Sequence, residues 1–92
     1  MNFEIGDIVK STSGHDKNGL FVIISIDKNG FLAIIDCKHH TRVNPKRKNP
    51  KHLVKIGHSE EILNKVNSHA TDKEIYKAIQ NFEKEWVDLY VF

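Results

Sequence analysis

The side chains best suited to bind a ligand form a basic run between residues 38 and 55. This run holds seven of the 14 Lys and Arg residues and no acidic residue. Its cations are Lys38, Arg42, Lys46, Arg47, Lys48, Lys51 and Lys55, with His39, His40 and His52 among them. Such a cluster attracts phosphates, and the counterions that it displaces from RNA supply affinity without sequence preference. The alternative is a solvated loop without a ligand, but the single sign of the charge favours RNA contact.

A polar connector, residues 13–19, is the second candidate. Its candidate RNA-contacting residues are Ser13, Gly14, His15 and Lys17. A glycine lets the backbone approach a ribose–phosphate chain closely, and Lys17 adds a positive charge. The structural alternative is a tight turn between two strands, closed by the side chain of Asp16.

Metal binding and catalysis are poorly supported. Cys37, His39, His40, His52 and His58 are the possible zinc ligands. Zinc sites in small domains normally use paired cysteines or closely spaced histidine pairs, and neither pattern is present. Cys37 with a nearby histidine is also a possible nucleophile and base, but nothing in the sequence orients the imidazole. We therefore expect no metal, no cofactor, no catalytic residue and no enzymatic activity.

The elements that position these segments are mostly strands. Two β-branched runs, residues 5–12 and 20–27, flank the connector and predict the first two strands. The second run is continuously apolar over much of its length, which predicts burial on both faces. Asn29-Gly30 before the apolar residues 31–36 predicts a hairpin and a third strand.

Two further strands complete the predicted sheet. Residues 41–44 predict a brief fourth strand, and residues 52–56 predict a fifth. Pro45 and Pro50 bracket residues 46–49 and predict a loop there, because a sheet interior does not accommodate such a pair. Five short strands without intervening helices predict a mainly β fold, a small closed barrel.

Helical signals follow the strands. Ser59 is a suitable N-cap for a short helix, and Thr71 and Glu74 form a capping box for a second. Apolar residues of the second helix recur at heptad spacing. This seam consists of Ile75, Ile79, Phe82, Trp86 and Leu89. The seam packs on the barrel or, alternatively, docks on a partner or a second copy. We expect intramolecular packing, and a monomer rather than a homodimer. The candidate partner-binding residues are Phe82, Trp86 and Leu89.

The unit of strand, connector and strand resembles the KOW motif. Gly6-Asp7-Ile8-Val9, then Gly14, Lys17 and Gly19, precede an apolar strand in the order typical of that motif. The KOW motif occurs in ribosomal proteins and transcription elongation factors. There it forms part of a small SH3-like barrel and often contacts RNA.

Later segments make the resemblance more specific. Residues 19–24, 33–36, 45–48 and 51–53, with Arg42, follow one another as in the eukaryotic-type large-subunit ribosomal proteins numbered fourteen. The chain also resembles the small bacterial KOW-domain RNA-binding proteins similar to them. The resemblance implies an SH3-like barrel that binds ribosomal RNA or another translation-associated RNA, with ribosomal proteins as further partners.

Two positions differ from the family pattern. His15 stands where a basic residue usually follows the connector glycine, so this position lacks a permanent charge. Cys37 stands where a glycine is common after the third strand. We therefore expect the turn to take its unusual backbone φ at another residue.

Size and composition limit the remaining possibilities. The 92 residues, 39% of them apolar, suffice for one domain. We expect residues 1–57 to form the barrel and residues 58–92 to form a helical extension packed on it, as one structural unit. The first 58 residues carry a net charge of +5 and the others −3, so only the first part suits a polyanion. The single cysteine and the lack of a membrane-length apolar run predict a cytoplasmic protein without membrane contact.

The sequence thus predicts an RNA-binding protein, associated with the ribosome or with translation, that grips phosphates through the connector and residues 42–52. The alternative, from a different class, is a protein-interaction module of the transcription or translation machinery that uses the C-terminal seam.

Overall fold

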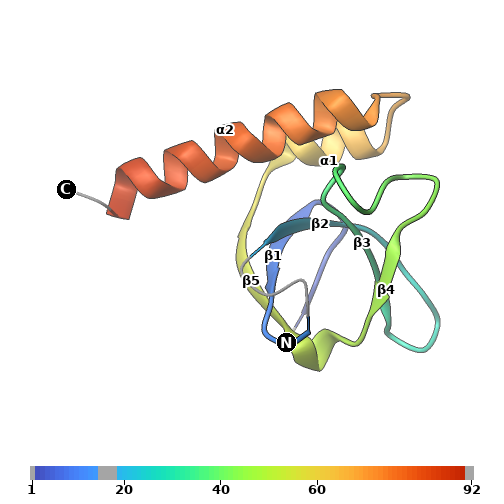
Figure 1. Cartoon of the computed structure of the whole chain (residues 1–92). Helices are drawn as coiled ribbons and strands as arrows, with labels where there is room; N and C mark the ends of the chain where they lie inside the picture. Colours follow the sequence, from blue (N-terminus) through green and yellow to red (C-terminus); the bar gives the residue numbers. More distant parts are fainter. Residues whose placement is uncertain (1, 15–18, 91–92) are drawn as a thin grey trace.

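The computed structural model describes residues 2–14 and 19–90, with side chains as far as Trp86. Its strands are β1 (Asp7–Ser11), β2 (Leu20–Ile26), β3 (Leu32–Ile35), β4 (Lys46–Lys48) and β5 (Leu53–His58). The 3-10 helix η1 (Pro50–His52) joins β4 to β5, and the helices α1 (Glu60–Val66) and α2 (Asp72–Tyr90) follow. Both helices lie on one side of the sheet, and the C-terminal half of α2 projects past it (Figure 1). Within the described ranges, no helix is long and apolar enough to cross a membrane.

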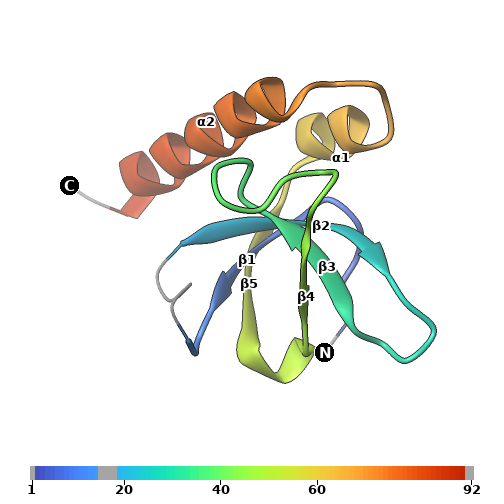
Figure 2. The same cartoon turned by 45° about the vertical axis from the view of Figure 1, so that its right-hand side comes forward.

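The five strands form one antiparallel sheet in the order β4-β3-β2-β1-β5. The mainly β fold with two C-terminal helices is therefore as predicted. The predicted closure of the barrel is wrong, because β4 and β5 are the two edges of the sheet and no described pairing joins them. The chain turns through η1 between these edges, so the sheet curls without closing (Figure 2).

The strand β2 is buried on both faces, as its apolar run predicts. Phe21 and Ile23 lie in one apolar cluster, which we call the sheet core, and Val22 lies in another, the helix-side core. Side chains alternate between the faces of a strand, so neighbouring residues of β2 enter different cores. The sheet core also contains Val9, Leu32, Ile34 and Leu53.

The helix-side core joins the sheet to both helices. It contains Ile8, Val22 and Ile35 from the sheet, with Ile62, Val66, Ile75, Ala78 and Ile79 from the helices. Phe82 packs against it one turn further along α2. The ring of Phe82 lies over Gly57 of β5, where an added Cβ atom would come within 2.8 Å of it. The first three residues of the seam therefore pack within the chain, as we expected.

Both helices begin where their caps predict. The side chain of Ser59 accepts a hydrogen bond from the amide of Ile62 at 3.2 Å. Oγ1 of Thr71 accepts one from the amide of Glu74, also at 3.2 Å. Each bond satisfies an amide that has no partner inside its own helix. These local signals correctly placed the start of α1 and of α2.

The predicted fourth strand is wrong. Thr41 and Asn44 instead close a tight turn, with the amide of Asn44 donating to the carbonyl of Thr41 at 3.1 Å. The strand is Lys46–Lys48, which the two prolines led us to predict as a loop. Pro45 and Pro50 flank β4 without interrupting it. Because β4 pairs only with β3, at the edge of the sheet, such flanking prolines cost no ladder hydrogen bond.

The turn after β3 also differs from expectation. Cys37 itself has a positive φ of 64°, so the left-handed backbone falls at residue 37 and not at another residue of the turn. Oδ1 of Asp36 explains this conformation, because it accepts the amides of Lys38, His39 and His40 at 2.9, 2.9 and 2.8 Å. The chain reverses tightly around this oxygen, and the reversal falls on residue 37.

Candidate nucleic-acid interface

The polar connector and the basic strand β4 meet in space. Nζ of Lys48 lies 3.4 Å from the carbonyl oxygen of Ser13, to which it donates a hydrogen bond. A Cβ atom added to Gly14 would lie 3.9 Å from the same ammonium group. Gly14 has a φ of +77°, a conformation that glycine adopts without strain. Ser13, Gly14 and Lys48 are thus brought together from positions 35 residues apart.

The residue before the connector contacts η1. The amide and Oγ1 of Thr12 both donate to the carbonyl oxygen of His52, at 2.8 and 3.1 Å. Ser11 pairs with Leu53 in the sheet, and this pairing places η1 beside the connector. The neighbouring Lys51 is exposed, and its amide is held by Oδ1 of Asn49 at 3.0 Å. His52 and Lys51 therefore adjoin the residues that Lys48 contacts.

Arg47 takes part in a different set of contacts. Its Nε and Nη2 atoms each lie 3.2 Å from Oδ2 of Asp27, and its guanidinium lies 4.0 Å from the centroid of the Phe31 ring. Desolvation raises the pKa of Asp27, but the amides of Phe31 and Asn29 and the Arg47 side chain outweigh it, so the pKa is lowered. Arg47 thus fastens β4 to the β2–β3 hairpin, with 60% of its side chain exposed.

Arg42 fastens the two helices to the sheet. Nη1 donates to the carbonyls of Lys65 and Ala70 at 3.1 and 3.4 Å. Nη2 donates to those of Val66 and Ser68 at 2.9 and 3.2 Å. These carbonyls lie at the end of α1 and in the turn after it, where no helical amide is available. Because both terminal nitrogens are engaged, we leave Arg42 out of the proposed phosphate-binding group.

Four further residues were predicted from sequence to contact RNA, and the structure describes two of them. Lys38 is exposed on the turn after β3, beside α2 rather than β4. Lys46 is half-buried on β4, opposite Ile34. His15 and Lys17 lie outside the described residues.

The chemistry of the Cys37 thiol argues against a nucleophile. Burial, and after it the nearby carboxylates of Asp72 and Asp36, raise its pKa to about 12, although Arg42 acts in the opposite direction. The thiol therefore stays protonated at neutral pH, whereas a nucleophilic cysteine reacts as the thiolate.

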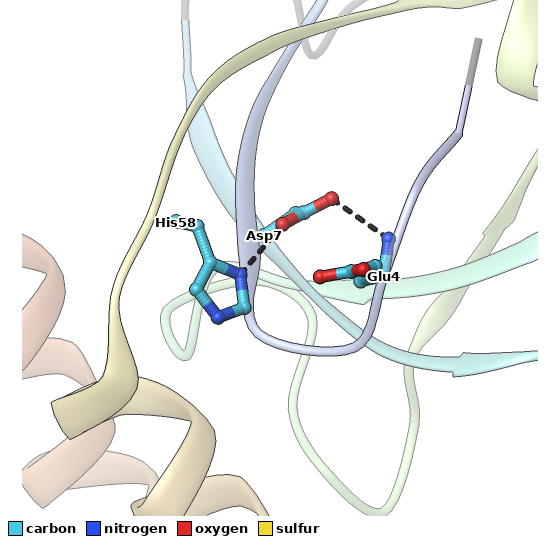
Figure 3. Close-up of side chains that lie close together, drawn as sticks. All are labelled: Glu4, Asp7 and His58. Carbon is cyan, nitrogen blue, oxygen red and sulfur yellow. Dashed lines mark hydrogen bonds and ion pairs between the residues drawn. The ribbon is translucent and has the colours of Figure 1, made fainter.

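A buried charge network that sequence reasoning missed lies at the start of β1. The fully buried carboxylate of Asp7 is 2.7 Å from Nδ1 of His58 and accepts a hydrogen bond from the amide of Glu4 at 2.7 Å (Figure 3). It also lies 3.3 Å from Nζ of Lys55. Nε2 of His58 lies 3.1 Å from Glu60. The hydrogen bonds to Asp7 and then to Glu60 raise the pKa of His58. The network follows from the pairing of β1 with β5, which sets Asp7 opposite His58 and is a feature of the fold rather than of a local sequence pattern.

The same network offers a set of possible metal ligands. Oxygen or nitrogen atoms of Glu4, Asp7 and His58 lie within 4.8 Å of one another. The Lys55 ammonium already lies against the central carboxylate, and a metal cation there would be repelled by it. We therefore describe this group as an ion-pair network that joins β1, β5 and α1.

The C-terminal seam divides along α2. Ile75 and Ile79 are buried and Phe82 packs on them, whereas 38% of Trp86 is exposed. The side chain of Leu89 lies outside the described residues. Of the three candidate partner-binding residues, Phe82 is therefore used within the chain, and Trp86 lies on the projecting half of the helix.

Comparison with models of known protein families found no match to the chain. A comparison with curated proteins also found none. The KOW resemblance thus stands on the residues quoted for it and stays a prediction.

Proposed function

We propose that this protein binds RNA through a basic face made of Ser13, Gly14, Lys46, Lys48, Lys51 and His52. The observation that carries the proposal is the contact of Lys48 with Ser13. The connector and the basic run were each selected from sequence as RNA-contacting segments, for separate reasons. A shared position on the folded chain lets both grip one stretch of sugar–phosphate backbone.

The proposed grip combines mobile charge with a fixed backbone. β4 pairs with β3, and β1 pairs with β5, so the sheet holds both sides of the face. Lysine ammonium groups neutralise phosphates, and the released counterions favour binding of any sequence. Gly14 has no side chain to keep the RNA backbone away. Ribosomal RNA, or another translation-associated RNA, is the ligand that the KOW resemblance suggests.

The test compares two triple variants with the same change of charge. In the first, Lys46, Lys48 and Lys51 of the basic face become Gln. In the control, the exposed Lys73, Lys77 and Lys84 of α2 become Gln. Binding of a labelled RNA hairpin is measured by fluorescence anisotropy over a series of salt concentrations. Circular dichroism confirms that each variant is folded.

We expect the basic-face variant to bind all RNAs more weakly, with a flatter dependence of log K on log salt. Each lost phosphate contact removes about 0.7 to 0.9 from that slope. The control variant keeps the parent slope, although its net charge is the same. Equal slopes for the two variants would mean that net charge, and not this face, governs binding.

A protein-interaction module is the second candidate, and the exposure of Trp86 favours it. Large aromatic side chains are enriched at the centres of protein interfaces, and Trp86 lies on a half-helix that extends past the sheet. Trp86→Ser would then abolish binding to a protein partner while leaving RNA affinity unchanged. The two measurements separate the two functions.

A further inference from the structure

A second feature of the fold lies between the sheet and α2, away from β4. A cavity of about 320 Å³ opens there, beside the turn that follows β3. Its lining residues are Gly19, Leu20, Asp36, Lys38, Tyr76, Ile79, Gln80 and Glu83. Gly19 belongs to the connector whose other end contacts Lys48, so the cavity and the basic face adjoin opposite ends of one segment.

The charge of the cavity determines which part of a nucleic acid it suits. Asp36 and Glu83 contribute two carboxylates, and Lys38 contributes one ammonium. The pKa of Asp36 is lowered, so its carboxylate is ionised at neutral pH. Burial raises this pKa, but the hydrogen bonds from the amides of His40, Lys38 and His39 outweigh burial. A phosphate inside the cavity would face both carboxylates and be repelled. A neutral group that carries N–H donors would instead be attracted.

The size and the aromatic wall suit a single base. Ligand pockets typically range from about 300 to 1,000 Å³, so this cavity is at the small end and has no room for an oligonucleotide. Tyr76 supplies a ring on which an unstacked base can lie, while Leu20 and Ile79 supply apolar contact. By contrast, no cation is among the described residues that line the larger cavity between the N-terminal segment and the β2–β3 hairpin.

We propose that this cavity holds one unpaired guanine of the bound RNA. Guanine is the base whose pairing edge presents two adjacent N–H donors, N1–H and the N2 amino group, and a carboxylate accepts both at once. Glu83 supplies that carboxylate, Tyr76 stacks on the base, and Lys38 neutralises the adjoining phosphate. This inference rests on the proposed RNA-binding function and adds to it a preference for one base in an unpaired segment.

The experiment uses four RNAs that differ at one position. Uridine oligonucleotides carry a central guanine, adenine, cytosine or uridine, and each is titrated with the full chain by fluorescence anisotropy. We expect the guanine oligonucleotide to bind about tenfold more tightly than the uridine oligonucleotide. Tyr76→Leu, which keeps apolar volume but removes the ring, reduces this preference.

Glu83→Gln provides the sharper measurement. Loss of the carboxylate weakens binding of the guanine oligonucleotide about tenfold and leaves the uridine oligonucleotide unweakened. If Glu83 acted only through its negative charge, Glu83→Gln would instead strengthen the binding of all four RNAs. Glu85→Gln is the matched control: it makes the same charge change on exposed α2 surface outside the cavity, and it keeps the guanine preference.

Three results would overturn the inference. Equal affinity for the four RNAs would remove the base preference, and the RNA-binding proposal would stand. A guanine preference that survives Glu83→Gln would place the base elsewhere on the chain. If the chain bound neither the four oligonucleotides nor the labelled RNA hairpin, the inference and the proposed function would both be overturned.

Discussion

The carboxylate of Asp7 and the imidazole of His58 lie 2.7 Å apart, so a partly buried hydrogen bond joins the first residue of β1 to the last residue of β5. Lys55 approaches the same carboxylate from within β5, at 3.3 Å. A buried carboxylate is costly unless it is paired and hydrogen-bonded, and Asp7 is both. The network therefore fixes one end of the β1–β5 pairing, directly before the chain enters α1.

The first prediction concerns the buried charge. Asp7→Asn removes the partner of both His58 and Lys55, and we expect it to lower the free energy of unfolding by about 1–3 kcal/mol. His58 and Lys55 remain partly exposed and can be hydrated, which limits the loss. Urea denaturation provides the measurement. Asp27→Asn removes an exposed ion pair and should change stability little. A similar loss in both variants would contradict a special role for Asp7.

The second prediction concerns pH. The pKa of His58 is raised in the folded chain, so folding binds its proton more tightly. The resulting stabilisation is complete below the unfolded pKa of about 6.5 and is lost as the pH rises through the raised folded value. The free energy of unfolding should therefore decrease above about pH 6.5. His58→Gln should flatten that part of the profile, whereas His69→Gln, at an exposed position, should not.

The third prediction separates two roles of Arg42. A lysine at this position cannot reach the four carbonyls that the guanidinium binds, so Arg42→Lys should cost about 1–3 kcal/mol of stability. RNA affinity, measured where the variant is folded, should not change. Loss of RNA affinity without loss of stability would restore Arg42 to the phosphate-binding group. Arg47→Lys serves as the exposed control.

The fourth prediction concerns the contact between β5 and α2. Gly57→Ala would place a Cβ atom 2.8 Å from the ring of Phe82, and we expect a loss of about 1–3 kcal/mol. Phe82→Leu removes the far end of that ring. The double variant should therefore lose less unfolding free energy than the sum of the losses in the two single variants. Strict additivity in thermal or urea denaturation would show that the ring is not what excludes a side chain at residue 57.

The features predicted correctly from sequence depend on residues close together in the chain. The Asn29-Gly30 hairpin closes as expected: Gly30 has a φ of +83°, and the amide of Asn29 binds Oδ1 of Asp27 at 2.8 Å. The cap at Ser59 involves an amide only three residues away. Such signals need no knowledge of the rest of the fold.

The features that were missed depend on distant partners. Lys46–Lys48 has no apolar alternation, and only its pairing with β3 makes it a strand. Arg42 was interpreted as a phosphate ligand, but carbonyls 23 to 28 residues away occupy it. Asp7 and His58 are 51 residues apart. Both halves of the basic face were selected from sequence, but the contact between them joins residues 35 positions apart.

The burial of β2 on both faces has a consequence for how the chain unfolds. Val22 belongs to the core shared with the helices, while Phe21 and Ile23 belong to the other core. Detachment of the helices would expose Val22, and fraying of the sheet would expose Phe21 and Ile23. Neither core can therefore melt alone, and we expect one cooperative transition in which the calorimetric and van't Hoff enthalpies agree.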